Sequence, residues 1–296
     1  MERKQASDFD QELLNLFDKY VHGDIDRRGF LERAAKFAVG GVTALMLLDT
    51  LNPRFAEAQQ VAKDDKRIKT ETIEYPSPAG SGKMKGYLAR PAAAKGKRPM
   101  VLVVHENRGL NPHIEDIARR IALEGYDAFA PDALTVSGGY PGDEDKAREA
   151  FGKLDQDKAR EDFIAAFAFL KSRPDCTGKI GVVGFCWGGG MTNKLAVAIP
   201  EVAAAVPFYG AQPKAEDVAK IKAPMLINYA DKDDRINAGI PAFEEALKAN
   251  KVKYQLFKYD GTQHGFNNDT TPRYDKAAAT QAWKRTMDFF KKNLKG

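Results

Sequence analysis

The chain has 296 residues, of which 43% are hydrophobic, 29% charged and 10% aromatic. This composition is typical of a folded globular protein and excludes a disordered or fibrous one. The 46 basic and 41 acidic residues leave a net charge of only +5 and are spread along the chain, so nucleic-acid binding is not indicated. Two cysteines and four histidines are too few for a disulfide framework and leave little material for a structural metal site.

The first 58 residues have the layout of a secretory leader. An apolar run, Phe37–Leu48, follows a basic cluster and precedes an Ala-x-Ala sequence at positions 56–58. The run is too short for a stable membrane span. Arg27 and Arg28, followed by Gly-Phe-Leu, resemble the twin-arginine export motif. One prediction is therefore that residues 1–58 form a twin-arginine signal and that residues 59–296 form the mature periplasmic protein.

The alternative prediction is a retained N-terminal arm on a cytoplasmic protein. Apolar residues between Phe9 and Tyr20 recur at helical spacing, as in a folded amphipathic helix. Asp26 and Glu32 also depart from the residues usual in the twin-arginine motif. A retained arm would pack on the body or on a second subunit. In the second case the protein would be a homo-oligomer.

From Ile68 onward, short apolar runs alternate with segments of helical periodicity, as in stacked βα units. Two runs joined by a turn rich in Gly and Ser predict an antiparallel entry hairpin, Ile68–Tyr75 and Met84–Arg90. Unbroken apolar runs predict strands buried on both faces, as in a parallel sheet. These strands are Met100–His105, Asp127–Ala130, Ile180–Phe185, Ala203–Phe208, Met225–Tyr229 and Tyr254–Tyr259.

The segments between these strands predict helices, and no linker divides the region. The helices are Ile114–Glu124, Asp143–Leu170 with a break, Gly188–Ile199, Ile240–Asn250 and Pro272–Leu294. The fold class is therefore α/β, with a mostly parallel central sheet and helices on both faces. Ligands of such sheets bind at the carboxyl ends of the strands, so we expect the chemistry in the loops that follow strands.

Cys186 is the candidate nucleophile. The sequence Gly-Phe-Cys-Trp-Gly, residues 184–188, lies between a buried strand and a helix, which is the context of a nucleophile elbow. A thiolate at a helix N-terminus is favoured by the helix dipole. Cys176 has no such setting. The glycine run lacks the Lys-Ser/Thr sequence of a phosphate-binding loop, so the sequence gives little support to a phosphate site.

A thiol nucleophile needs a base, and His264 is the candidate. It follows the last strand between polar and glycine residues, whereas His22 lies in the leader, His105 ends a buried strand and His113 opens a helix. The acid of such a site lies between nucleophile and histidine in the chain. Three carboxylates fit that position, and periodicity does not separate them: Asp231, Asp233 and Asp234.

These motifs resemble the dienelactone hydrolase family of α/β hydrolases. The resemblance runs from Ile68 to the C-terminus and is carried by His-Glu-Asn-Arg-Gly-Leu-Asn at 105–111, Gly-Phe-Cys-Trp-Gly-Gly at 184–189, the loop around Asp233, and His-Gly-Phe at 264–266. Four motifs in register are much more specific than any one of them. The resemblance implies the α/β hydrolase fold and the cleavage of an ester or lactone.

The resemblance also implies roles for individual residues. Cys186, Asp233 and His264 would form a Cys-Asp-His triad. Glu106 would face the cysteine, keep it as a thiol at rest, and take its proton when substrate enters. The backbone N–H groups of Asn107 and Trp187 would form the oxyanion hole.

One departure concerns the substrate. Four residues after the histidine, Asn268 replaces an arginine that helps to hold the substrate carboxylate in the founding enzymes. The sequence offers three other arginines for that task, Arg108, Arg148 and Arg273, without placing them.

The predicted function is therefore hydrolysis of a small-molecule ester or lactone through a thioacyl intermediate, with no metal or organic cofactor. Two alternatives stay open. One is a non-catalytic or accessory exported protein that keeps the α/β hydrolase body to bind a small ligand, because fold alone does not fix function. The other is a broad esterase or thioesterase.

Overall fold

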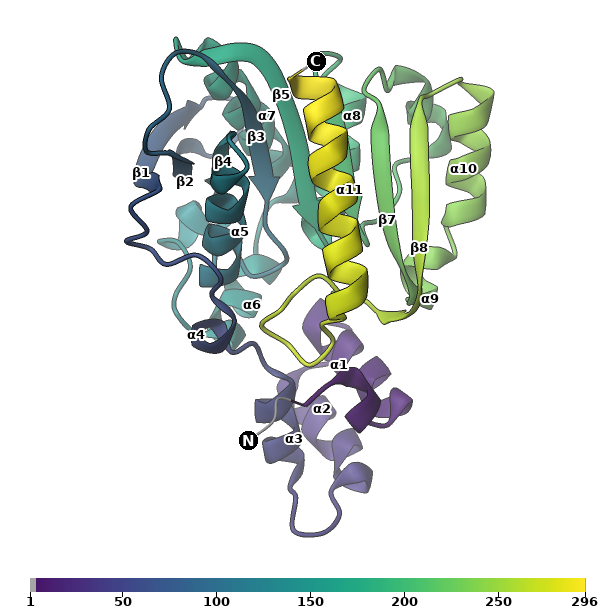
Figure 1. Ribbon diagram of the computed structural model, residues 1–296. Helices are drawn as coiled ribbons and strands as arrows, with labels where there is room; N and C mark the ends of the chain where they lie inside the picture. The colour runs from purple at the N-terminus through teal and green to yellow at the C-terminus, as the bar shows by residue number, and fades with distance from the viewer. Residues whose placement is uncertain (1–3, 296) are drawn as a thin grey trace.

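A single eight-stranded sheet forms the centre of the computed structural model, which describes residues 4–295 (Figure 1). The strand order is β1-β2-β4-β3-β5-β6-β7-β8. β1 pairs antiparallel with β2 and β2 antiparallel with β4, and all other pairs are parallel. The strands are β1 Ile68–Ser77, β2 Gly82–Pro91, β3 Arg98–Val104, β4 Asp127–Pro131, β5 Cys176–Phe185, β6 Ala204–Phe208, β7 Met225–Lys232 and β8 Tyr254–Gln263.

The predicted fold class is confirmed, and each predicted strand is present. The central strands β4 and β6 are buried along their whole length, which explains why they appear in the sequence as unbroken apolar runs. β1 lies at the edge of the sheet, and only Ile68, Tyr75 and Ser77 in it are buried. The predicted entry hairpin corresponds to β1 and β2, with a register that pairs Ser77 with Gly82 across the turn.

Helices cover both faces of the sheet, and each face has its own hydrophobic core (Figure 1). α5 Pro112–Leu123 and α11 Lys276–Leu294 pack on one face; α7 Gln156–Ser172, α8 Trp187–Ala198 and α10 Ile240–Ala249 pack on the other. The predicted break between positions 143 and 170 separates α7 from α6 Glu144–Gly152. α9 Asp234–Asn237 directly follows the acid loop, and two 3-10 helices complete the body, Ala133–Ser137 and Ala215–Lys220.

Residues 4–58 fold into a helical arm beneath the carboxyl edge of the sheet (Figure 1). The expected amphipathic helix corresponds to α1, whose apolar side packs with α2 and α3 in a separate small core. The arm consists of α1 Gln11–His22, α2 Arg27–Ala34, α3 Ala44–Leu51 and α4 Phe55–Ala58, with 3-10 turns at Ala6–Asp8 and Ala35–Phe37. Among residues 4–295, no helix has both the length and the apolar character that crossing a membrane requires.

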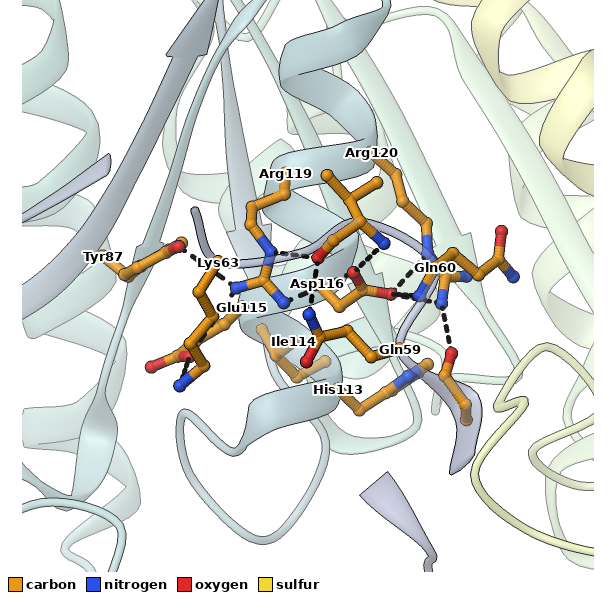
Figure 2. A network of polar contacts seen from close by, with 12 residues as sticks. Gln59, Gln60, Lys63, Tyr87, His113, Ile114, Glu115, Asp116, Arg119 and Arg120 are labelled. Atoms are coloured by element: carbon orange, nitrogen blue, oxygen red, sulfur yellow. Dashed lines mark hydrogen bonds and ion pairs between the residues drawn. The ribbon is translucent and has the colours of Figure 1, made fainter. Parts of the chain in front are cut away.

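A buried polar network fixes the chain where the arm joins the body (Figure 2). The carboxylate of Asp116 on α5 accepts hydrogen bonds from the backbone N–H groups of Gln60, at 3.1 Å, and Val61, at 2.9 Å. Arg119 donates to the carbonyl of Val61 at 2.9 Å, and Arg120 donates to Asp116 at 2.7 Å. Asp116 and Arg119 are almost fully buried and Arg120 is mostly buried, so the junction is tied to the folded body.

The same network extends to the loop that follows β8. Asp269 accepts from Arg120 and from the side chain of Gln60, both at 2.6 Å. The segment that directly follows the arm, α5 and the loop after His264 are therefore held together at one point.

Candidate active site

Cys186 stands at a strained turn between β5 and α8. Its backbone has φ 56° and ψ −115°, a conformation that is unfavourable for a residue with a side chain. A Cβ atom on Gly184 would lie 2.1 Å from the carbonyl oxygen of Gly188, and one on Gly188 would lie 2.4 Å from that of Val104. Only glycine fits at both places, so the Gly-x-Cys-x-Gly sequence is what lets strand and helix approach closely enough to form the elbow.

Asp233 and His264 form a buried pair at the ends of β7 and β8. Nδ1 of His264 lies 2.6 Å from Oδ2 of Asp233. Of the three carboxylates that the sequence leaves open, Asp231 instead pairs with Lys258 at 3.0 Å, and Asp234 is exposed. The structure therefore brings Asp233, and neither of its neighbours, to the histidine.

The side chain that contacts the sulfur of Cys186 is His22, at the end of α1. Its Nε2 lies 3.3 Å from the Sγ atom of Cys186. Nε2 of His264 is buried, lies within 4.8 Å of the same sulfur, and has no hydrogen-bond partner among the described residues. The sequence does not predict this contact and places His22 in the leader; in the structure the arm folds back under the carboxyl edge and brings its first helix to the elbow. No spacing or motif in the sequence signals this contact.

The two imidazoles change the acidity of the thiol. Burial by itself would raise the pKa of Cys186, but the facing His264 and His22 outweigh it and lower the pKa to about 6. Burial opposes the charged form of His264, yet the sulfur and the Asp233 carboxylate raise the pKa of that imidazole to about 10. The site is therefore arranged for a thiolate beside an imidazolium at neutral pH.

Glu106 is hydrogen-bonded to a residue other than Cys186, whereas the two predicted oxyanion donors line the cavity beside it. The carboxylate of Glu106 accepts a hydrogen bond from Asn268 at 2.7 Å, and the hydrogen bond of the Cys186 sulfur is with His22. Asn107 and Trp187 line the same cavity as Cys186. Trp187 is the first residue of α8, where a backbone N–H has no partner within the helix.

The three arginines proposed as anchors for a substrate carboxylate all contact the arm. Arg108 donates to the carbonyl of Val21 at 3.2 Å, and Arg273 pairs with Asp18 at 3.1 Å. The guanidinium of Arg148 lies over the ring of Tyr20, 4.5 Å from its centroid. Each of the three therefore has a partner in the arm, and Arg108 also lies near enough to Cys186 to interact with its charge.

A cavity of about 270 Å³ opens beside the sulfur. Its lining includes the apolar side chains of Phe151, Trp187 and Met191 and the basic side chains of Lys194 and Arg235. Arg235 also lies 2.9 Å from Nε2 of His22. The cavity therefore offers a small, partly apolar space with cations in its lining, next to the candidate nucleophile.

One group of side chains within residues 4–295 has the composition of a metal site. The ligand atoms of His22, Cys186 and His264 lie within 4.8 Å of one another, and thiolate with imidazole suits Zn²⁺. The guanidinium of Arg235 beside Nε2 of His22 opposes a divalent ion at that position more strongly than the single charge of a protonated imidazole. We therefore assign this group to thiol chemistry.

A cysteine at a nucleophile elbow, followed in the chain by an aspartate and a histidine that pair at the carboxyl edge of the sheet, defines an α/β hydrolase with a thiol nucleophile. The chain belongs to the dienelactone hydrolase family, whose model matches residues 84–294. A second family model, described as YqhI-like, matches residues 1–36 of the arm.

Similar proteins support this assignment. A Salmonella typhi protein named "Putative carboxymethylenebutenolidase" is 34% identical over 230 residues, which cover 72% of this chain and 84% of that protein. The "Putative hydrolase fragment YghX" of Escherichia coli is 56% identical over 114 residues, 38% of this chain and 97% of the fragment. A solved structure titled "Putative Dienelactone Hydrolase", from Klebsiella pneumoniae, superimposes with a TM-score of 0.67 at 29% identity, covering 75% of this chain and 98% of its own.

Proposed function

We propose that the protein hydrolyses a small ester or lactone with Cys186 as nucleophile. The observation that carries this proposal is the strained elbow cysteine with an Asp233–His264 pair beside it. The sulfur attacks the carbonyl carbon, and the backbone N–H groups of Trp187 and Asn107 bind the oxygen as it gains charge. The bond to the leaving alcohol then breaks and leaves a thioester on Cys186. A water molecule, with His264 as its base, hydrolyses that thioester.

The cavity indicates the class of substrate. A volume of about 270 Å³ accommodates a compact acyl group, and Phe151, Trp187 and Met191 favour an apolar one. Arg235 and Lys194 favour a substrate that carries a carboxylate near the scissile bond. Some relatives are named carboxymethylenebutenolidases, a name that denotes a lactone bearing a carboxymethylene group as substrate. We extend that substrate class, a lactone with a carboxylate, to this chain. A broad esterase or thioesterase remains the second candidate.

The decisive experiment compares the protein with its Cys186→Ala variant on p-nitrophenyl acetate and on a panel of lactones and thioesters. We expect the substitution to abolish turnover and to remove iodoacetamide labelling at that position. Full activity in the variant would contradict the proposal. Binding of a lactone by both proteins without turnover by either would favour the alternative of a ligand-binding protein.

We propose that residues 1–58 remain attached to the body. The scissile bond of the predicted leader follows Ala58, which is 8% exposed and whose carbonyl lies 3.4 Å from Arg120. The arm also forms ion pairs with the body, among them Arg27, one of the two arginines of the predicted signal, with Asp145 at 2.6 Å. These contacts favour the retained arm over twin-arginine export, and the compartment itself stays a prediction.

The N-terminal residue of protein purified from its native source tests this proposal. Met1 or Glu2 is expected. Gln59 as the first residue would contradict retention and would support export to the periplasm.

A further inference from the structure

The arm brings a second imidazole to the nucleophile. His22 is the last residue of α1, and its Nε2 lies 3.3 Å from the Cys186 sulfur, well within hydrogen-bond distance for that atom. Its side chain is 12% exposed. Its ring packs edge-to-face against that of His264, with 4.8 Å between centroids. One thiol therefore has two histidines beside it.

Both histidines are oriented in the same way. Nδ1 of His264 faces the carboxylate of Asp233, and Nδ1 of His22 lies 2.8 Å from the backbone carbonyl and 3.3 Å from the carboxylate of Asp18. An acceptor at Nδ1 places the proton on that nitrogen and leaves Nε2 to act as the base. The arm thus repeats the aspartate–histidine arrangement of the body beside the same sulfur.

The body holds this part of the arm through residues adjacent to the elbow. The side chain of Asn107, next to a predicted oxyanion donor, donates to the carbonyl of Val21 at 2.8 Å, and Arg108 donates to the same carbonyl. Arg273 pairs with Asp18. Because these contacts fix Val21, which precedes His22, and Asp18, the acid behind it, the position of His22 does not depend on a single weak contact.

The two imidazoles differ in what they contact. Nε2 of His22 lies beside the sulfur and the guanidinium of Arg235, whereas His264 faces the sulfur and the Asp233 carboxylate. Burial opposes the charged form of His264, and the charge of the sulfur is the largest cause that raises its pKa. Formation of the thioester removes that charge and frees His264 to take a proton from water. The geometry therefore separates a base for the thiol from a base for water.

We propose that His22 is a catalytic residue supplied by the arm, and that it exchanges the proton of the Cys186 thiol. This inference rests on the proposed function. At rest the sulfur is a thiolate and its proton lies on Nε2 of His22. The thiolate forms a bond to the carbonyl carbon. As the bond to the leaving oxygen breaks, His22 gives its proton to the leaving group. His264 then takes a proton from water, whose oxygen displaces the sulfur as a thiolate, and that proton passes to His22. Asp18 is the positioning residue of His22.

The test is the His22→Gln variant of the full chain, with two readouts. The first is the rate of iodoacetamide alkylation of Cys186 against pH. It should rise with pH through about 6 in the parent and through a clearly higher pH in the variant, because a facing imidazole is lost. The guanidinium groups of Arg108 and Arg235 and the imidazole of His264 also face the site and are unchanged in both proteins.

The second readout is the dependence of acylation on the leaving group. The variant should lose about 10²-fold in kcat/KM on an ethyl ester, whose alkoxide needs a proton, and much less on p-nitrophenyl acetate. Added imidazole should restore part of the ethyl ester activity in His22→Ala, and Asp18→Asn should show a smaller loss. Arg28→Ala, an exposed position on the same arm, is the control and should behave as the parent.

Three outcomes overturn the inference. An unchanged alkylation profile with unchanged rates means that His22 does not exchange the thiol proton. An increase in activity means that the arm blocks the site. Equal losses on both esters with no rescue by imidazole mean that His22 only supports the structure. Each is distinct from failure of the proposed function, which would appear as full activity in Cys186→Ala.

Discussion

The two parts of the chain place a histidine beside the same sulfur by different means. In the body, His264 follows a parallel strand, and the sheet itself brings that strand end near the elbow on β5. In the arm, His22 ends a helix that reaches the elbow only because residues 4–58 fold back and pack there. The first placement follows from the topology of the fold, and the second follows from docking.

This difference teaches where sequence patterns carry information about a site. The body has an extensive core on each face of its sheet, whereas the arm has one small core of its own and polar contacts to the body. The order of nucleophile, acid and histidine is a property of the body's fold and is visible in the chain. The docking of an N-terminal helix is set by long-range contacts that no motif records.

The largest expected effect in the body is that of Asp233→Asn. The change keeps the shape of the residue and removes the charge behind His264, so turnover should fall by about 10²–10⁴-fold. Steady-state kinetics on p-nitrophenyl acetate measure the loss. Asp231→Asn and Asp234→Asn are the matched controls and should retain activity. A larger loss of activity in either control would identify that carboxylate, and not Asp233, as the partner of His264.

The sequence predicts most of the fold and part of the site for physical reasons. Unbroken apolar runs identify the central strands because both of their faces are buried, and the glycines at 184 and 188 identify the elbow because the turn has no room for a Cβ atom. Three adjacent acidic residues share one loop, so only coordinates distinguish Asp233 from the rest. His22 could not be predicted, because its contact spans 164 positions and depends on how the arm packs.

A smaller effect separates the stability of the two regions. Leu48 is fully buried in the core of the arm, and Leu48→Ala should destabilise that core by about 2–5 kcal/mol. Limited proteolysis should then cleave within the first 58 residues while the body resists. Leu45→Ala, on the same helix but 46% exposed, is the matched control. Unfolding of arm and body together in the Leu48 variant would show that the two regions form one cooperative unit.

The smallest expected effect concerns the border between the regions, where Arg235 contacts His22 and lines the cavity. Arg235→Ala should raise KM for a carboxylate-bearing ester by about tenfold, because one charge-assisted contact is lost. KM for a neutral ester of the same size should change little. Lys232→Ala removes an exposed charge nearby as a control. Equal effects on both esters would show that Arg235 does not recognise the carboxylate.

The covalent intermediate tests the central claim most directly. In His264→Gln acylation should continue, but deacylation should become slow because His264 is the base for water, so a short incubation with p-nitrophenyl acetate should leave an acetyl group on the protein. Peptide mass spectrometry should find that group on Cys186. An acetyl group on another residue, or none on a variant that still releases p-nitrophenol in a burst, would contradict the account.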